Sequence, residues 1–390
     1  MKEMKYCNFI DIFPIRMGKT PPRGDDSSWD KKRLTKNYWV SVADITKNEG
    51  KYITDTKEYI SDSAAKKIYK VKANSLLMSF KLTIGKMAFA GVDLSTNEAI
   101  IAIPENEKYN LHFLYYYLSS YDWKTLTEGN EKVKGATLNK TSIGQIKLPI
   151  ISISEQEKIV SFLDAEFAKI DALKANAASQ LQAAKDLFQS ALKEMLTPQE
   201  GWERKMLKDV STYYNGLTYK PTDVSDKGFL VLRSSNIQNN ILSLEDQVRV
   251  SVDINEKLKI HKGDIIMCSR NGSKALIGKV AIIPEEYNDM TFGTFMMVFK
   301  GGNNPFLYYF FLSDLFKKQI WRGEATMINQ ITRYMLDEVY VYFPSLPEQE
   351  RIAARLDAIS EKVKALQANY DQTLTLCNDL KQSLLKSIFE

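Results

Sequence analysis

The sequence predicts an α+β protein with two globular domains of mixed short strands and helices, each followed by a long helix. Three observations support this prediction. The sequence repeats at an offset of 193 residues, two long segments have helical apolar spacing, and the segments before them contain short apolar runs typical of strands. We expect the two helices to pair as an antiparallel coiled coil with pseudo-two-fold symmetry. The predicted boundaries are 1–150 and 199–346 for the domains, and 151–198 and 347–390 for the helical regions.

The repeat is strongest in the two helical segments. The run Glu-Gln-Glu at 155–157 recurs at 348–350, and 19 of the 42 residues from 155 to 196 are identical to those 193 positions later. The preceding segments repeat more loosely, as in the run Phe-Leu-Tyr-Tyr at 113–116 and 306–309. Similar helices joined to divergent domains indicate a common helical frame that carries two domains, each of which recognises a different target.

Residues 155–197 and 348–390 are expected to form the helices, because apolar side chains recur every three or four positions. Ser154 is suited to cap the first helix, and Pro347 marks the start of the second. A rod of this length, roughly 60 Å at 1.5 Å per residue, cannot bury its apolar stripe alone. The natural partner is the other helix, and a dimerisation stalk is the alternative. The predicted interface positions are Leu163, Ile170, Leu181, Phe188, Leu356, Val363, Leu374 and Leu384.

The composition is that of an ordinary water-soluble protein, with 44% hydrophobic and 26% charged residues. No apolar run approaches the roughly 20 residues that cross a bilayer, and the N-terminus lacks a signal-peptide core, so we expect a cytoplasmic protein. The 3 cysteines and 2 histidines lie too far apart for a zinc motif. We therefore expect neither a metal site nor histidine-dependent acid–base catalysis.

The net charge of +5 is unevenly distributed. Residues 1–150 carry +7 and residues 199–345 carry +1, whereas the helical segments 151–198 and 346–390 carry −2 and −1. This pattern fits globular domains that face a polyanion and helices that face protein.

Loops of both domains carry side chains that read nucleic acid elsewhere, since Arg pairs with guanine, Asn with adenine, and Lys or Ser with phosphates. The clearest is the turn at 269–274, between two expected strands. For each residue alone, a solvated surface role is the alternative. The predicted DNA-binding residues are Lys19, Arg23, Lys81, Lys86, Lys134, Asn139 and Lys140 in the first domain, and Tyr219, Lys220, Arg233, Ser234, Asn236, Arg270, Asn271, Lys274, Arg322, Gln330 and Arg333 in the second.

Several motifs resemble the specificity subunits of type I restriction-modification systems. The run Leu-Pro-Glu-Gln-Glu-Arg-Ile at 346–352 and its counterpart at 154–159 are similar to the start of that family's helical regions. Gly-Trp-Glu at 201–203 resembles the start of its target recognition domains, and Ile-Gly-Lys at 84–86 and 277–279 resembles one of its strands. The resemblance covers nearly the whole chain, although the first domain lacks the Gly-Trp-Glu start.

The resemblance implies that each globular domain is a target recognition domain that reads one half of a bipartite, asymmetric DNA site. The helices would set the spacer between the halves and dock two modification subunits, and restriction subunits would join the complex. It also implies that this chain is not a catalyst and binds no cofactor. S-adenosylmethionine, ATP and Mg would then be bound by the partner subunits.

Three alternatives stay open. The chain could be the specificity subunit of a related multi-subunit methyltransferase or restriction system, or a coiled-coil adaptor that does not bind DNA. As an enzyme, its best motif is Asn-Asn-Pro-Phe at 303–306, which superficially resembles the Asn-Pro-Pro-Phe of adenine methyltransferases. That run lacks the second proline and coincides with a predicted helix start.

Overall fold

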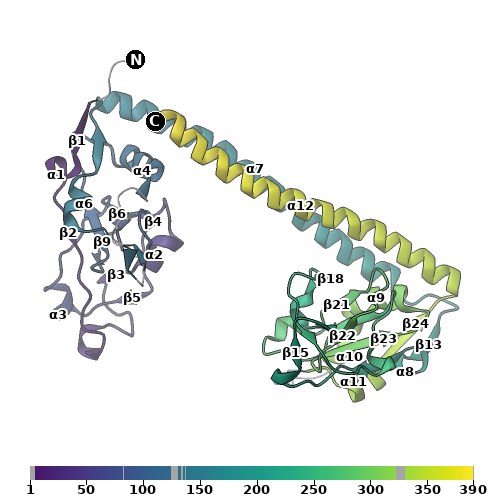
Figure 1. Ribbon diagram of the computed structural model, residues 1–390. Helices are drawn as coiled ribbons and strands as arrows, with labels where there is room; N and C mark the ends of the chain where they lie inside the picture. Colours follow the sequence, from purple (N-terminus) through teal and green to yellow (C-terminus); the bar gives the residue numbers. More distant parts are fainter. Residues whose placement is uncertain are drawn as a thin grey trace. The chain divides into compact units, whose positions relative to one another are not determined.

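The computed structural model describes residues 5–81, 83–123, 131–132, 135–136, 138–321 and 330–389. The chain divides into two compact units, Met1–Ala175 with Thr373–Glu390, and Asn176–Gln372 (Figure 1). Each unit contains one globular domain and parts of both long helices, α7 (Ile153–Met195) and α12 (Leu346–Phe389). The α+β fold with two domains, each followed by a long helix, is therefore confirmed.

The globular part of the first unit is built from short strands and short helices. Its main sheet has the order β2-β9-β6-β7-β4, a second sheet has the order β5-β3-β8, and β1 pairs with β12. Its strands are β1 (Tyr6–Asn8), β2 (Arg16–Met17), β3 (Tyr38–Val40), β4 (Tyr52–Ile53), β5 (Glu58–Tyr59), β6 (Leu76–Ser79), β7 (Met87–Ala90), β8 (Ser95–Thr96), β9 (Ile100–Ile103), β10 (Glu131–Lys132), β11 (Gly135–Ala136) and β12 (Lys147–Pro149). Its helices are α1 (Phe9–Ile12), α2 (Val42–Lys47), α3 (Asp62–Ala65), α4 (Leu111–Ser120) and α6 (Lys140–Gly144).

The second unit repeats this topology. Its sheets have the orders β14-β23-β20-β21 and β15-β19-β16-β22, and β13 pairs with β24. Its strands are β13 (Glu203–Met206), β14 (Thr212–Asn215), β15 (Val224–Ser225), β16 (Phe229–Leu232), β17 (Ile237–Gln238), β18 (Ile241–Leu242), β19 (Arg249–Val250), β20 (Ile265–Cys268), β21 (Val280–Ile282), β22 (Met290–Phe292), β23 (Met296–Lys300) and β24 (Tyr340–Phe343). Its short helices are α8 (Leu207–Val210), α9 (Asn304–Leu312), α10 (Asp314–Ile320) and α11 (Arg333–Asp337).

The central strand of each main sheet is covered on both faces, which explains its unbroken apolar run. In the first unit, Leu76 and Met78 of β6 belong to the same core cluster as Phe113 of α4. Leu77 points to the opposite face and belongs to the cluster that contains Val40. The Phe-Leu-Tyr-Tyr runs lie in α4 and α9, whose aromatic side chains share core clusters with the sheets.

Helix α7 is fixed to its domain at its first turn. The cap of α7 is Ser152 rather than the predicted Ser154, because Ser152 and Glu155 form a reciprocal capping pair with Ser152 N donating to Glu155 Oε2 at 3.0 Å. Gln156 is fully buried and donates to the carbonyls of Lys108 and Ile151. The Gln of the recurring Glu-Gln-Glu run is therefore a structural anchor.

About two turns further along, each helix accepts a tyrosine hydroxyl from its domain. Tyr116 of α4 donates to Asp164 of α7, and Tyr309 of α9 donates to Asp357 of α12. Burial, and then the neighbouring carboxylate, raise the pKa of both tyrosines well above the ordinary value. Both hydroxyls therefore stay protonated, and both domains dock on their helices through the same contact.

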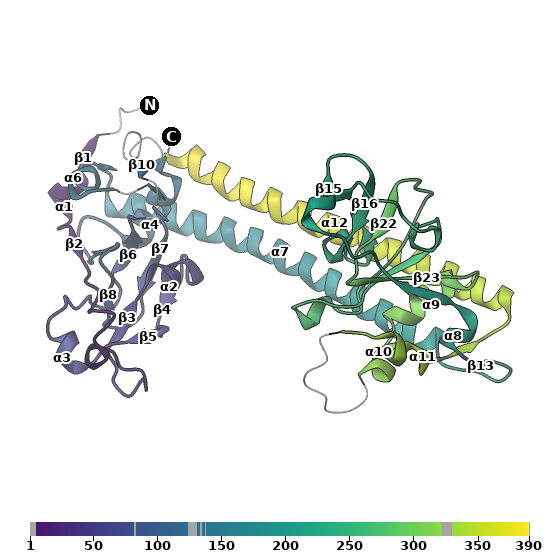
Figure 2. The ribbon, with the colours of Figure 1, turned by 60° about the horizontal axis from the view of Figure 1, so that its bottom comes forward.

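Within each unit the two long helices run side by side in opposite directions (Figure 2). In the first unit, Lys381 Nζ lies 2.6 Å from Asp171 Oδ1, and Lys174 Nζ donates to Asn378 at 2.6 Å. In the second unit, Lys185 Nζ donates to Gln367 at 3.0 Å. The antiparallel direction is as predicted, whereas the coiled-coil packing and the pseudo-two-fold symmetry stay predictions.

The eight predicted interface positions of the helices are all buried or half-buried. Leu163, Ile170, Leu181 and Leu356 are buried, and the others, Phe188, Val363, Leu374 and Leu384, are half-buried. Leu163 packs with Tyr116 and Leu385, within this chain. Their role toward another subunit stays a prediction. Leu173, by contrast, is 56% exposed, so it lies outside the buried stripe of α7.

The last turn of α12 completes the core of the first unit, which gives a testable expectation. The ring of Phe389 lies 5.6 Å from Phe113 and 5.4 Å from Tyr117, between ring centroids. Phe389→Ala should lower the free energy of unfolding of the first unit by about 2 kcal/mol, less than for a fully buried Phe. Urea unfolding would measure this loss. Leu376→Ala, at a position of the same helix that is 58% exposed, is the control, and equal losses in the two variants would contradict the packing role.

Candidate nucleic-acid interface

One edge of each globular domain gathers loops that are far apart in the sequence. In the second unit, Leu217 N donates to Phe292 O at 2.7 Å, Ser269 N to Phe295 O at 2.9 Å, and Ile331 N to Ser269 O at 2.7 Å. These bonds join the segment after β14, the end of β20, the segment before β23 and the segment at 330–331. Several of the predicted DNA-binding residues lie in these loops.

The first unit builds the same junction from repeat-equivalent segments. Lys19 N donates to Thr96 O at 2.8 Å, Phe80 N to Ala99 O at 3.0 Å, and Leu138 N to Phe80 O at 3.0 Å. Lys81 therefore takes the place that Arg270 has in the second unit, and Ala99 takes that of Phe295. The scaffold of the two edges is shared, while the side chains that they display differ.

The edge of the second unit is hollowed into a cleft of about 670 Å³. Arg270 belongs to the predicted set, and an isolated β-bridge pairs it with Gln330, another member. Five members of the predicted set line the cleft: Tyr219, Arg233, Ser234, Arg270 and Asn271. Lys220 and Lys274 are exposed in neighbouring loop positions.

Arg233 is held in the cleft by an acidic residue. Its guanidinium lies 2.6 Å from Asp246 Oδ2, and both residues line the cavity. A hydrogen bond from Ser235, together with the charge of Arg233, keeps the pKa of Asp246 below its usual value. Asp246 is therefore a carboxylate at neutral pH, which orients Arg233 and could accept from a cytosine amino group.

Two predicted asparagines have structural work instead. Asn236 is fully buried, donates to the carbonyls of Ser243 and Asp246, and accepts from Arg233 N at 2.8 Å. This corrects the sequence-based prediction, because a buried amide with these partners cannot reach DNA. Asn271 is half-buried, and its amide ties its loop to Ser234 by donating to Ser234 Oγ at 3.0 Å.

Arg333, another predicted residue of the second unit, is not among the residues that line the cleft. Arg333 is exposed on α11, and its guanidinium lies 5.7 Å from the centroid of the Tyr213 ring. Tyr213 in turn donates to Asp337 of the same helix. Arg322 and, in the first domain, Lys134 lie outside the described residues.

In the first unit, Arg23 is held between aromatic rings and a carboxylate. Its guanidinium lies 4.3 Å from the Trp29 ring centroid and 4.9 Å from that of Trp39, and it pairs with Glu58. Trp39 also donates from its indole to the Lys19 carbonyl at 3.1 Å, which ties Arg23 and Lys19 to one surface.

The other lysines of the first domain are more dispersed. Lys86 pairs with Glu49 at 2.8 Å, so its charge is partly neutralised. Asn139 caps α6 by accepting from Ser142 N, and Lys140 is exposed beside it. Lys81 lies 5.3 Å from the centroid of the Phe80 ring. Which of these side chains contact DNA stays a prediction.

The sequence reasoning missed Phe295 and Asp246. Both line the cleft, and Phe295 is 52% exposed although it is a large apolar residue. In the repeat, Phe295 is the counterpart of Ala99, between two equivalent strands. An alignment at the constant offset of 193 does not pair these two residues, because the loops there differ in length.

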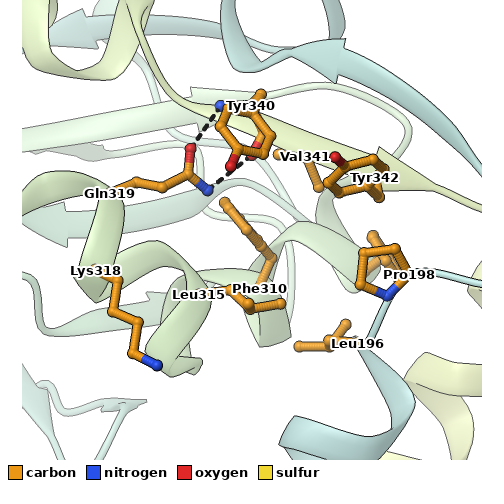
Figure 3. A pocket seen from close by; sticks show the side chains of 10 residues that line it. Leu196, Pro198, Phe310, Leu315, Lys318, Gln319, Tyr340, Val341 and Tyr342 are labelled. Carbon is orange, nitrogen blue, oxygen red and sulfur yellow. Dashed lines mark hydrogen bonds between the residues drawn. The ribbon is translucent and has the colours of Figure 1, made fainter.

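A second hollow of the same unit is separate from this cleft and mostly apolar (Figure 3). It measures about 270 Å³, and Leu196, Phe310, Leu315 and Val341 are among its lining residues. At its rim, the Gln319 side chain exchanges two hydrogen bonds of 3.0 Å with the backbone of Tyr340. It contains none of the predicted DNA-binding residues.

The described part of the chain has neither a metal-binding group nor a helix suited to a membrane. No group of three His, Cys, Asp or Glu side chains there could hold a metal ion. Among the same residues, no helix has the length and apolar character needed to cross a membrane.

Known proteins resemble the chain in sequence. Residues 1–183 and 199–375 match the family described as "Type I restriction modification DNA specificity domain". The type I restriction enzyme EcoKI specificity subunit of Escherichia coli strain K12 is 29% identical over 197 residues, which are 48% of this chain and 42% of that protein. The StySPI specificity subunit of Salmonella potsdam is 27% identical over 199 residues, with the same shares. The matches thus span less than half of the length of these two relatives.

Solved structures share the fold. One, from work on complex assembly and conformational transition of the type I R-M system, has a TM-score of 0.75 at 16% identity and covers 100% of this chain and 98% of its own. The HsdS subunit from Thermoanaerobacter tengcongensis has a TM-score of 0.52 at 16% identity, covering 99% and 96%. With the family match extending over both repeats, the chain belongs to the type I restriction-modification DNA specificity family.

Proposed function

We propose that this chain is the sequence-specific DNA-recognition subunit of a type I restriction-modification complex. Each globular domain reads one half of a bipartite, asymmetric site. The observation that carries this proposal is the loop junction built twice on one scaffold, with Lys81 and Ala99 in one copy and Arg270 and Phe295 in the other. Two such edges with different side chains suit two different half-sites.

The helices serve as the frame of the complex. They set the spacer between the half-sites and dock two modification subunits, which restriction subunits then join. Both helices accept a tyrosine hydroxyl from their own domains at repeat-equivalent aspartates, which supports a frame built alike for two like partners. A cytoplasmic location, where the DNA lies, goes with this function.

The chain supplies recognition and no chemistry of its own. S-adenosylmethionine, ATP and Mg belong to the partner subunits. The Asn-Asn-Pro-Phe run begins α9, where Asn304 is buried and donates to the carbonyls of Gly263 and Phe299 at 2.8 and 3.0 Å. These bonds give Asn304 a structural role and leave it unable to bind an adenine.

A selection experiment tests the proposal. The chain, co-purified with its modification subunits, is incubated with a library of random duplexes at a fixed salt concentration, and the bound DNA is sequenced. We expect two short defined sequences separated by a constant number of unread base pairs. No enriched sequence would contradict the proposal and favour an adaptor that does not bind DNA. Methyl transfer by the isolated chain would contradict its non-catalytic role.

A further inference from the structure

We infer that Phe295 is a positioning residue for base recognition. It holds the Arg270 guanidinium in place to read a guanine in the half-site of the second domain. This inference rests on the proposed function and adds a determinant that neither the sequence nor the family match assigns. It starts from one feature of the cleft, a large apolar side chain that is 52% exposed and lines the cleft together with Arg270.

The backbone fixes Phe295 and Arg270 relative to one another. The carbonyl of Phe295 accepts from Ser269 N at 2.9 Å, from Arg270 N at 3.1 Å and from Ser269 Oγ at 2.9 Å. On its other side, Arg270 is bridged to Gln330. The ring and the base of the arginine side chain are therefore parts of one rigid junction.

The ring also contacts the guanidinium. Arg270 Cζ lies 5.2 Å from the Phe295 ring centroid, within the range of a cation–π contact. Arg270 itself is exposed, and no carboxylate in the described part of the chain lies within ion-pair distance of it. Arg233, on the same cleft, is paired with Asp246. Of these two arginines, Arg270 is the one with its donors available.

This arrangement suits guanine recognition. Arginine reads guanine by two parallel hydrogen bonds to O6 and N7, and the planar fork loses less entropy on binding when it is already held in place. An aromatic face supports the guanidinium plane without consuming its donors. The first unit has Lys81 and Ala99 at the equivalent places, so Lys81 offers no planar fork, and the ring near it is that of its neighbour Phe80. The Arg270–Phe295 pair therefore belongs to the second domain.

Four single variants test the inference in the complex with the modification subunits, by selection from random duplexes and sequencing. Phe295→Ala should reduce the preference for guanine at one position of one half-site by roughly two- to fivefold. Phe295→Tyr should retain it, because the ring face remains. Arg270→Lys keeps the charge but loses the fork, and should reduce the preference by roughly 5- to 150-fold. Leu315→Ala, at the separate hollow in Figure 3, is the control and should change nothing.

The outcomes separate this inference from the proposed function. A wild-type complex that selects no sequence would overturn the proposed function. A wild-type complex that selects a bipartite site, with Phe295→Ala weakening all sequences equally or altering the other half-site, would overturn the inference alone. Thermal unfolding of Phe295→Ala should match the wild type within error, because the ring is half exposed, and a large loss would also count against a positioning role.

Discussion

A chain that carries the first globular domain twice is expected to recognise a symmetric DNA site. In this variant, residues 199–345 are replaced by a second copy of residues 5–150, and both half-sites should become inverted copies of the first. The expectation follows from the predicted pseudo-two-fold symmetry of the antiparallel helices. Affinity for the natural site should fall by at least about 100-fold, since each mismatched base pair costs about 1–3 kcal/mol.

The docking contacts make this exchange feasible. The copied domain would bring the equivalent of Tyr116 to Asp357, which already accepts a tyrosine from the second domain. Several docking positions differ, and the largest change is at Leu196, which stands where the first domain is completed by Phe389, so the variant should include Leu196→Phe. Selection from random duplexes measures the outcome, and the chain with two second domains is the reciprocal control. An unchanged asymmetric site would place recognition outside the globular domains.

The second large effect concerns stability. Leu163→Ala should lower the free energy of unfolding by about 2–5 kcal/mol, because this side chain is fully buried against Tyr116 and Leu385 and its removal leaves a cavity. The same substitution at Leu173, ten positions along the same helix, should cost less than about 0.5 kcal/mol, since that leucine is 56% exposed. Denaturant unfolding of the two variants compares them directly.

A similar loss in both variants would show that the apolar stripe is not where the structure has it. The comparison holds residue type, helix and unit constant, so helix propensity cannot explain a difference. The midpoint of unfolding should shift for Leu163→Ala while its slope with denaturant stays constant.

Much of the fold could be predicted because the repeat and the helical spacing are properties of the chain itself. The repeat distinguished the two similar helices from the two divergent domains. The mostly apolar runs at 75–80 and 264–268 form the inner strands β6 and β20. The details at helix ends were less predictable. Ser152 and Ser154 both precede a glutamate by three positions, and only packing of the first turn decides which one caps the helix.

The candidate site was harder to predict, because side-chain direction is set by tertiary contacts. Arg233, Arg270 and Tyr219 were found from residue type and loop position. Asn236 is also a polar residue of a predicted loop, yet its side chain turns inward and donates to buried carbonyls. Phe295 was missed because an isolated phenylalanine is normally assigned to the core, and only the structure places its ring in the cleft.

The central claim, that the chain reads two different half-sites, is tested most directly by mapping methylated bases in the host genome with and without its gene. We expect an asymmetric motif with two defined halves and a constant unread spacer. The motif should disappear when the gene is deleted and change in only one half when Arg270 is replaced by alanine. A continuous motif, or a bipartite motif that persists in the deletion strain, would contradict recognition of two half-sites by this chain.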